Sequence, residues 1–392
     1  MTTPLTLTGG AAPALWLIVA RAGGLLALAG AGRVAWRLTG SPIAAVTAAA
    51  AVALGPWWWF NTALGNSEGL LAAAVLWAIA AHLDGHRRVA LLLALAAALM
   101  RPEAWAFLGL YGLWLWRADP GARRLVAAAF VAVPVLWLGP DAIGAGGAIG
   151  ASHAALGRAS PGSAALSDHP VLTVLADAVR QLTVPAALAA LAGAVLGPAA
   201  ARWLALGALA WGVEVAVMTA LGYAGNPRYL AAAAAVGCAL AGVGVAVARR
   251  RWVPVGAVAL VAAMLAVGLG DLRAQTRELG VRAERRTDLE TLLARTGGPA
   301  RLRACGTVRA SESMRTMVSW RVEVPLMDLE TQPVAPGAAL LAAPYEGGQD
   351  KPILDAAARR RFPVITRQGA WVLRASCPQF PAAGARAGPG PT

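Results

Sequence analysis

Three short turns of this sequence hold the residues best suited to chemistry, and each turn separates two long apolar runs. They read Gly65-Asn66-Ser67-Glu68-Gly69, Arg101-Pro102-Glu103-Ala104-Trp105 and Gly225-Asn226-Pro227-Arg228-Tyr229. Ionisable groups inside or beside an apolar span are costly, so in membrane proteins they mark substrate sites by default. The turns therefore predict a site for a polar, anionic ligand.

Two arginines of these turns are candidates for holding a phosphate or pyrophosphate. Arg228 and Tyr229 precede an Ala-rich helix and have no acidic neighbour in sequence. Arg101 offers the same planar guanidinium, which matches phosphate geometry. The alternative for Arg101 is an ion pair with Glu103 that only joins two helices, and this alternative is compatible with a ligand role.

Glu68 opens a predicted helix, with Asn66 or Ser67 as its N-cap. An acidic residue in the first turn of a helix compensates the helix dipole, which is a purely structural role. The functional alternative is that Glu68 and Asn66 form hydrogen bonds to sugar hydroxyls or orient an acceptor. The preceding tryptophans are predicted as an interfacial anchor or a sugar-stacking wall: Trp57, Trp58 and Trp59.

The composition is that of a membrane protein. The 392 residues are 58% hydrophobic and 14% charged, with a mean hydropathy of +0.59, whereas soluble domains carry about 25% charged residues. The net charge of +14 comes almost entirely from dispersed arginines, Lys351 being the one lysine. No basic stripe or nucleic-acid-binding motif accompanies them, so a nucleic-acid partner is excluded.

Ten apolar spans are predicted, which gives an all-α polytopic membrane bundle over residues 1–270. The spans cover residues 12–38, 42–60, 67–83, 88–100, 102–117, 123–139, 184–198, 202–222, 229–248 and 252–270. Basic residues occupy alternate connections, which are therefore cytoplasmic. The other connections hold the three turns, so these turns and both chain ends are predicted to lie outside the cytoplasmic membrane.

The first span is poorly suited to initiate membrane insertion. Arg21 interrupts it, at a cost of about 2.5–3.5 kcal/mol for an isolated helix, and no basic signal-peptide region precedes it. We therefore expect one further helix and its outer loop upstream of this sequence. The alternative is a short tail that is translocated by itself. Arg21 is also an expected partner for Glu214, which lies in the middle of span 202–222.

The loop over residues 140–170 and the segment after it predict a lid. The pattern Asp168-His169-Pro170 indicates a helix start, and apolar residues then recur at helical spacing to Leu182, as in a helix that lies in the membrane interface. His153 and His169 are expected to be solvated. No metal-binding spacing of His, Cys or Asp occurs in the sequence, so no metal ligand is assigned, and a divalent cation stays open as a cofactor.

Residues 271–378 predict a small extracytoplasmic α/β domain, because residues 271–392 hold 18 of the 34 basic and 12 of the 20 acidic residues. A helix is expected over 275–296, strands near 302–306, 338–343 and 363–374, and helical pieces near 311–320 and 353–361. Cys305 and Cys377 are expected to form a disulfide in an oxidising compartment. Residues 379–392 are predicted to be a disordered tail.

The order of these features resembles the C-type (GT-C) integral-membrane glycosyltransferases, especially uncharacterised actinobacterial members. The resemblance covers about residues 13–270 and rests on the motifs GNSEG, RPEAW and GNPRYL, the long outer loop and an outer soluble domain. Enzymes of this superfamily transfer a sugar from a polyprenyl-phosphate carrier to an acceptor outside the membrane. The resemblance implies a polyprenyl-phosphate-sugar lipid, a glycan or protein acceptor of the cell envelope, and membrane lipids as partners.

The resemblance also implies roles for single residues. Arg228, Tyr229 and Arg101 would hold the carrier phosphate, while Asn66, Glu68 and Glu103 would shape the sugar and acceptor site. The superfamily carries its catalytic carboxylate in the first outer loop, but no acidic residue precedes Glu68 in this chain. The base is therefore unassigned, with Glu68 as the candidate substitute. The alternatives are a non-catalytic protein that binds or flips the lipid carrier, and an envelope scaffold.

Overall fold

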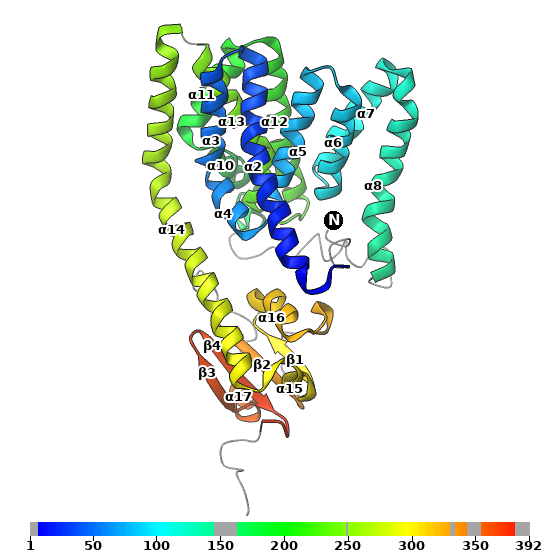
Figure 1. Cartoon of the computed structure of the whole chain (residues 1–392), viewed down its shortest axis with the longest axis vertical. Helices are drawn as coiled ribbons and strands as arrows, with labels where there is room; N and C mark the ends of the chain where they lie inside the picture. The colour runs from blue at the N-terminus through cyan, green and yellow to red at the C-terminus, as the bar shows by residue number, and fades with distance from the viewer. Residues whose placement is uncertain (1–6, 145–162, 248–249, 330–333, 343–353, 381–392) are drawn as a thin grey trace, which may run out of the picture. The chain divides into compact units, whose positions relative to one another are not determined.

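The computed structural model describes residues 7–144, 163–247, 250–329, 334–342 and 354–380. The chain forms two compact units, Met1–Arg273 and Ala274–Thr392. The first unit consists of helices that run mostly alongside one another, and the second contains a small β-sheet (Figure 1). The predicted lid loop 140–170 lies outside the described residues from 145 to 162.

The helices of the first unit follow one another with short connections. In chain order they are α2 (Ala12–Thr39), α3 (Pro42–Ala53), α4 (Pro56–Leu64), α5 (Glu68–Leu83), α6 (Arg87–Met100), α7 (Ala104–Ala118), α8 (Arg123–Gly144), α10 (Pro170–Leu182), α11 (Val184–Leu196), α12 (Ala199–Ala220), α13 (Ala231–Ala246) and the first part of α14 (Val253–Arg295). A 3₁₀ segment, Gly9–Ala11, precedes α2, and others lie between the later helices: Pro120–Ala122, Ala164–Leu166, Pro227–Leu230 and Arg250–Trp252.

Proline and glycine set the breaks between these helices. Pro42 begins α3, and the side chain of Ser41 caps it by accepting the Ala44 amide at 3.3 Å. The following break bends α3 and α4 by 63°, because Pro56 cannot donate the amide that would continue α3. A sharper bend of 91° separates α10 from α11, where Thr183 adopts a φ of 67°.

Two helices approach closely beside the three turns because they meet through glycine. A Cβ atom on Gly23 of α2 would lie 2.6 Å from the Cα of Leu70, and one on Gly69 of α5 would lie 2.8 Å from the Cα of Gly24. Any side chain at these positions would push the helices apart. Small residues at helix contacts are typical of membrane bundles, and here they fix the start of α5, where Glu68 lies.

The described residues contain five helices that are long and apolar enough to cross a membrane, or seven if each bent pair is one span. Helix α5 is a shorter apolar helix, and α6 and α7 have only 14 and 15 residues, against about 20 for a full span. The chain is thus a helical, multi-pass membrane protein. Each of the ten predicted spans contains a helix, but ten crossings stay a prediction.

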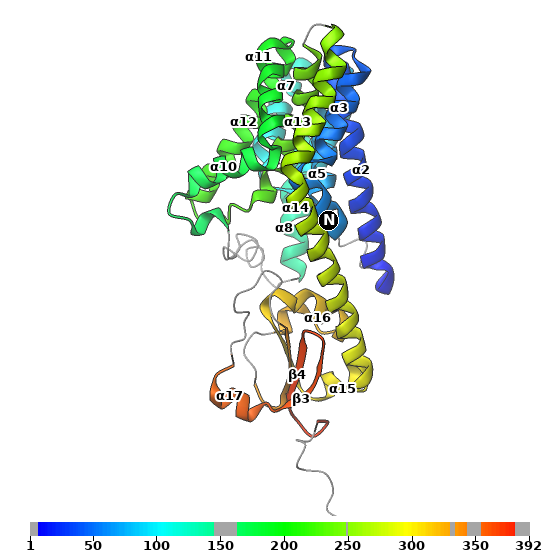
Figure 2. The ribbon, with the colours of Figure 1, turned by 90° about the vertical axis from the view of Figure 1, so that its left-hand side faces the viewer.

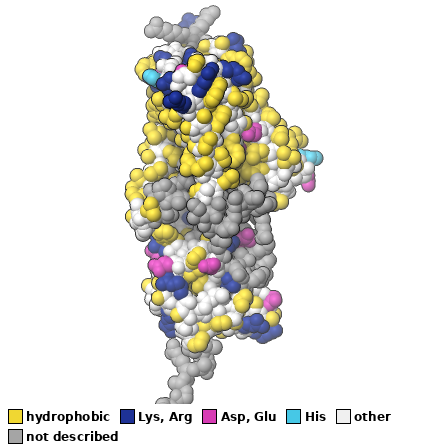
Figure 3. All heavy atoms as spheres, turned by 90° about the vertical axis from the view of Figure 1, so that its right-hand side faces the viewer, with side chains coloured by type: hydrophobic (Ala, Val, Ile, Leu, Met, Phe, Trp, Pro, Cys, Tyr) yellow, Lys and Arg dark blue, Asp and Glu magenta, His cyan; other side chains and the backbone are white. Residues whose placement is uncertain are grey.

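The surface of the first unit agrees with this conclusion. Figure 3 shows hydrophobic side chains over most of the visible face of the helical unit, with arginines gathered at one end. Large apolar side chains on α11 and α14 are more than half exposed, among them Leu188, Leu191, Val255 and Val258. Such a continuous apolar surface would be an aggregation hazard in water and is expected in contact with lipid.

Helix α10 has the predicted start and the predicted amphipathic pattern. It begins at Pro170, with His169 at the N-cap position. Its apolar residues Val171 and Leu172 are exposed, whereas Asp177 on the opposite face is buried. The helix therefore turns Val171 and Leu172 outward and Asp177 toward the protein, while Val174 is also buried and Arg180 is exposed.

The second unit has a four-stranded mixed sheet in the order β1-β2-β4-β3. Strands β1 (Thr307–Ala310) and β2 (Gly337–Ala342) are parallel, and β4 (Trp371–Ser376) pairs antiparallel with both β2 and β3 (Val364–Gln368). Figure 2 shows β3 and β4 beside the short helices of this unit. These are α15 (Gly298–Ala304), α16 (Arg315–Val322) and α17 (Ala356–Arg361), with 3₁₀ segments at Glu312–Met314 and Leu326–Asp328.

Two secondary-structure predictions in this unit are wrong, and a third is revised. Residues 302–306 were expected as a strand but mostly belong to α15, because Gly297 and Pro299 start a helix there. The strand expected over 363–374 is a hairpin, broken at Gly369 with a φ of 51°. The separate helix expected over 275–296 is the second half of α14, which continues without a break from Val253.

The three cysteines form one disulfide and leave one free thiol. Cys305 and Cys377 form a disulfide with their Cα atoms 5.4 Å apart, while Cys238 is buried and free in α13.

Phe380 was assigned to the predicted tail 379–392, but it packs in the core of this unit with an exposure of 6%. The rest of that tail lies outside the described residues.

Candidate functional site

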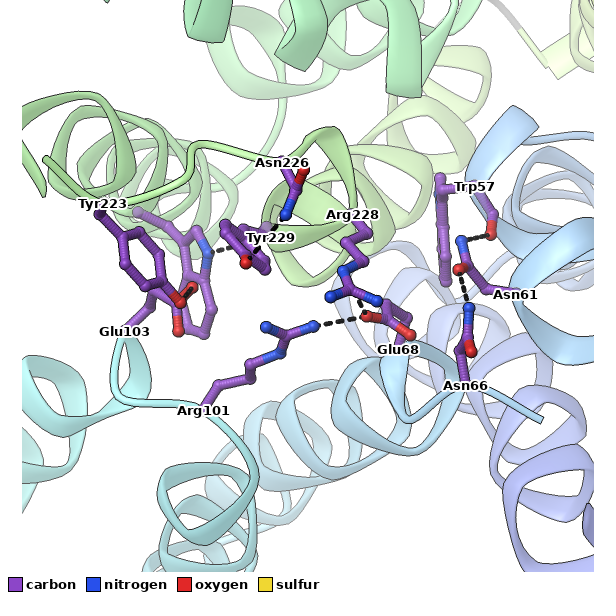
Figure 4. Close-up of polar contacts among 11 residues, drawn as sticks. Trp57, Asn61, Asn66, Glu68, Arg101, Glu103, Tyr223, Asn226, Arg228 and Tyr229 are labelled. Atoms are coloured by element: carbon purple, nitrogen blue, oxygen red, sulfur yellow. Dashed lines mark hydrogen bonds and ion pairs between the residues drawn. The ribbon is translucent and has the colours of Figure 1, made fainter. Parts of the chain in front are cut away.

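The three turns predicted from sequence meet at one end of the helical unit. Arg101 Nη2 donates a hydrogen bond to Glu68 Oε1 at 2.5 Å, and Arg228 Nε lies 3.8 Å from the same oxygen. Figure 4 shows both guanidinium groups approaching Glu68 from different helices. The structure thus brings together a carboxylate and two arginines that are far apart in sequence.

Local sequence explains how each arginine reaches this point. Arg101 ends α6 in an extended conformation, with φ −146° and ψ 133°, since the proline that follows it disfavours a helical conformation. Arg228 lies in a 3₁₀ turn, Pro227–Leu230, that precedes α13. The turn starts after Gly225, whose φ of 62° few residues other than glycine adopt readily.

The aromatic ring of Tyr229 contacts both arginines of the site. The Arg101 guanidinium lies 4.6 Å from the Tyr229 ring centroid, and that of Arg228 lies 5.7 Å from it. Tyr223 stacks on the other side, with ring centroids 4.8 Å apart. Because cation–π contacts and stacking favour fixed ring positions, Tyr229 keeps both positive groups close together.

Polar contacts fix Tyr229 itself from two directions. Asn226 Nδ2 donates to the Tyr229 hydroxyl at 3.0 Å, and Trp211 Nε1 of α12 donates to the Tyr229 carbonyl at 2.9 Å. Figure 4 shows the contact between Asn226 and Tyr229. The ring therefore belongs to a rigid network and is well placed to support a ligand contact.

Glu103 is the second carboxylate of the site and is completely buried, with an exposure of 0%. Its Oε1 accepts a hydrogen bond from the Tyr223 hydroxyl at 3.2 Å. The expected alternative, an ion pair between Arg101 and Glu103, is not the contact that forms, because Arg101 pairs with Glu68 instead. Buried oxygens Oε2 of both Glu68 and Glu103 have no hydrogen-bond partner among the described residues.

Asn66 belongs to a neighbouring cluster and lies apart from the arginines. Its Nδ2 donates to Asn61 Oδ1 at 2.7 Å, and Asn61 Nδ2 donates to the Trp57 carbonyl at 2.6 Å. Ser67 is the N-cap residue of α5, one of the two predicted candidates, although its side chain makes no capping bond. Asn66 is oriented by Asn61, a contact that sequence reasoning missed.

The three consecutive tryptophans do not share one environment. Trp57 and Trp58 are 2% and 9% exposed and belong to the core, whereas Trp59 is 40% exposed. Trp58 Nε1 donates to the Gly24 carbonyl at 2.9 Å, across the contact of α2 with α4. The predicted anchor or sugar-stacking wall is therefore wrong for Trp57 and Trp58, whose bulk fills the bundle.

An apolar cavity of about 590 Å³ lies inside the helical unit; no arginine or carboxylate of the site lines it, and it reaches the site through Trp211. Residues of α5, α6, α7, α12 and α13 line it, and Trp211 and Phe107 stack on each other at 5.2 Å along its wall. Trp211 also contacts Tyr229, so this wall is shared with the arginine site. Farther along the same helices the lining includes His82 and Tyr111, whose Nδ1 and hydroxyl are 3.1 Å apart.

Other predicted candidates are not part of the site. Arg21 Nη2 donates to the Ala63 carbonyl at 3.2 Å, so the expected contact with Glu214 is replaced by one with the end of α4. His153 lies outside the described residues. Within the described ranges, no group of three or more His, Cys, Asp or Glu side chains is arranged to hold a metal ion.

Three contributing residues were not singled out from sequence. Asn226 stands in the same turn as Arg228 and Tyr223 lies two residues before that turn, so their proximity to that arginine was a usable signal. Trp211 gave no such signal, because only the packing of α12 against α13 brings it to Tyr229. Comparison with protein-family models, with curated proteins and with solved structures finds no match to this chain.

The arrangement is suited to binding an anion. The Arg228 side chain is 47% exposed while that of Arg101 is 13% exposed, so one guanidinium is accessible and the other reinforces it from within. Arginine forks match the oxygens of phosphate. An anionic group that entered beside Tyr229 would meet both arginines and would lie next to an apolar cavity.

Proposed function

We propose that this protein transfers a sugar from a polyprenyl-phosphate-linked donor to a cell-envelope acceptor at the outer face of the cytoplasmic membrane. The supporting observation is that Arg101 and Arg228 converge beside an apolar cavity within a multi-pass helical bundle. This combination of two arginines with an apolar cavity suits an amphiphile with an anionic head. The proposal includes ten membrane crossings and a GT-C-like arrangement, with the C-terminal unit outside.

The roles of the residues follow from their chemistry. Arg228, assisted by Arg101, would bind the carrier phosphate and stabilise the charge that grows on it as the sugar leaves. Tyr229 would hold the two guanidinium groups in position. Asn66 would border the space for sugar and acceptor, and buried Glu103 would support it from behind by accepting the hydrogen bond of Tyr223. The cavity beside Trp211 would take the first part of the lipid chain.

A second function is favoured by the polar lining at His82 and Tyr111. An apolar cavity with polar groups in two places suits a protein that binds the lipid carrier or moves it between leaflets without chemistry. Release of free carrier phosphate from a sugar-loaded donor separates the two functions, since only the transferase produces it.

The experiment is a transfer assay in proteoliposomes with Arg228→Ala. We expect transfer to be lost, because one truncated charged contact at a binding site costs about 2–5 kcal/mol, while the half-exposed side chain leaves folding unaffected. Arg180→Ala is the matched control, since Arg180 is 76% exposed on α10 and pairs with Asp177. Normal transfer by Arg228→Ala would overturn the phosphate assignment.

A further inference from the structure

A single oxygen of Glu68 receives both guanidinium groups of the site. Arg101 Nη2 contacts Oε1 at 2.5 Å and Arg228 Nε approaches it at 3.8 Å. The other oxygen, Oε2, is buried and accepts no hydrogen bond from a described residue. Glu68 thus occupies the position at which an anionic group of a ligand would contact both arginines. Figure 4 shows Glu68 beside Arg101 and Arg228.

This carboxylate is an incomplete partner for two arginines. A buried ion pair is favourable only when its geometry is good and its remaining lone pairs are satisfied, and the unpaired Oε2 fails the second condition. A phosphate has more oxygens and accepts paired hydrogen bonds from a guanidinium fork. Arg228, with the longer contact and the greater exposure, is the arginine that exchanges partners more easily.

The charges of the site lead to the same conclusion. Arg101 and Arg228 carry two positive charges, and Glu68 and Glu103 carry two negative charges when ionised, so the four side chains sum to zero. A cluster with no excess positive charge binds an anion less tightly than the arginines alone would. The carboxylate in contact with the arginines therefore limits the affinity.

We propose that Glu68 competes with the ligand's phosphate for Arg101 and Arg228, and that this competition drives release of the lipid phosphate. The inference rests on the proposed function and extends it. Phosphate binding draws Arg228 away from Glu68, and return of Glu68 to the arginines expels the phosphate. Glu68 is in this account a positioning residue that sets the affinity and the residence time of the anionic lipid.

The test measures binding of a polyprenyl monophosphate to the full chain in nanodiscs, for wild type and Glu68→Gln. Glutamine keeps the size of the side chain and removes its charge. We expect affinity to rise roughly tenfold, which equals about 1.4 kcal/mol, with the change mainly in a slower dissociation rate. A weaker affinity would overturn the inference, because it would mean that Glu68 only holds Arg101 in place.

Glu103→Gln is the matched control, because it removes the same charge from the same site without touching an arginine ion pair. Its affinity should rise much less than that of Glu68→Gln. Equal gains in the two variants would contradict competition through direct contact. When Glu68→Gln is introduced into Arg228→Ala, it should raise the affinity much less than it does in wild type. The same rise in both backgrounds would contradict the exchange at Arg228.

Two further probes distinguish failure of this inference from failure of the proposed function. Inorganic phosphate and a polyprenol of equal length report separately on the head and the chain. If Arg228→Ala binds the polyprenyl monophosphate as wild type does, the proposed function and the inference both fail. If Arg228→Ala loses binding but Glu68→Gln also binds more weakly, the phosphate site stands and only the competition is wrong.

Discussion

The two ends of the helical unit both carry arginine–carboxylate pairs, but the pairs differ in burial. Helix α5 begins at Glu68, and Asp84 follows its other end, where it pairs with Arg33 at 2.8 Å and with Arg37 at 2.5 Å. Those two arginine side chains are 33% and 42% exposed, whereas Arg101 is 13% and Glu68 only 1% exposed. The pairs of Asp84 are partly open to solvent, whereas the Glu68–Arg101 pair is enclosed, with only Arg228 beside it accessible at 47% exposure.

The difference in burial indicates that the exposed ion pairs have a structural role and that the buried pair has a functional one. Exposed pairs contribute about 0–1 kcal/mol, and the basic end has the charge distribution that orients membrane helices. A buried pair costs several kcal/mol in desolvation, and apolar residues of similar volume are often as stable. The buried Glu68–Arg101 pair is therefore poorly explained by stability and well explained by a ligand that needs the arginine.

The largest expected effect is on folding, in Arg101→Ala. Removing this arginine leaves Glu68 buried with only the distant Arg228, so we expect a loss of about 3–5 kcal/mol in the free energy of unfolding. Denaturant unfolding in detergent micelles measures it. Arg88→Ala is the control at the other end, where Arg88 is 58% exposed and pairs with Asp119, and it should cost at most about 1 kcal/mol. Similar losses in both variants would remove the contrast between the ends.

An intermediate effect is expected from filling the cavity with Gly207→Phe. Gly207 lines the cavity, and a Cβ atom there meets nothing within 4 Å. Displacing about two methylene groups of the lipid chain costs about 1.6 kcal/mol, so the affinity for a polyprenyl monophosphate should fall about tenfold. Gly109→Phe on α7 is the control, since Gly109 is equally open but does not line the cavity. Equal affinities for the two variants would place the lipid chain elsewhere.

The smallest effect is expected from Asp84→Asn at the exposed end. The hydrogen bond from Arg33 is the main cause that lowers the pKa of Asp84 below its ordinary value of 3.8, and the charges of Arg33, Arg37 and His86 act in the same direction. A lowered pKa means that ionised Asp84 stabilises the fold above 3.8 and that this contribution is lost as the pH falls through the lowered pKa. The small difference in Tm between wild type and Asp84→Asn should vanish once the pH lies below the lowered pKa of Asp84. A difference that persists there would show that the charge of Asp84 is not its cause.

The sequence was a good guide to the helices and to the three turns, because both are local properties. Apolar runs ending at Pro102, Pro227 or Gly65 define helix ends through backbone restrictions that act within a few residues. The membrane class follows from the same runs. The hairpin at Gly369 and the continuous α14 were missed, since a single glycine and a change in composition do not reveal whether a strand turns or a helix continues.

The inside of the site was much less predictable. An ion pair of Arg101 with Glu103, two residues away, was the structural alternative weighed from sequence, but the partner of Arg101 is Glu68 at the start of α5. Trp211 and the cavity depend on how α12 packs against α7 and α13, and no local pattern contains that information. Long-range contacts decide which charges are buried together, and these contacts decide the chemistry.

The most direct test of the central claim is native mass spectrometry of the protein purified from its own membranes. We predict that wild type and Arg180→Ala retain a polyprenyl-phosphate-linked lipid and that Arg228→Ala loses it. The mass of the retained lipid would also identify the sugar. The same lipid complement in all three proteins, or no phosphate-bearing polyprenyl lipid on any of them, would contradict the assignment of Arg228 and Arg101 as the phosphate site.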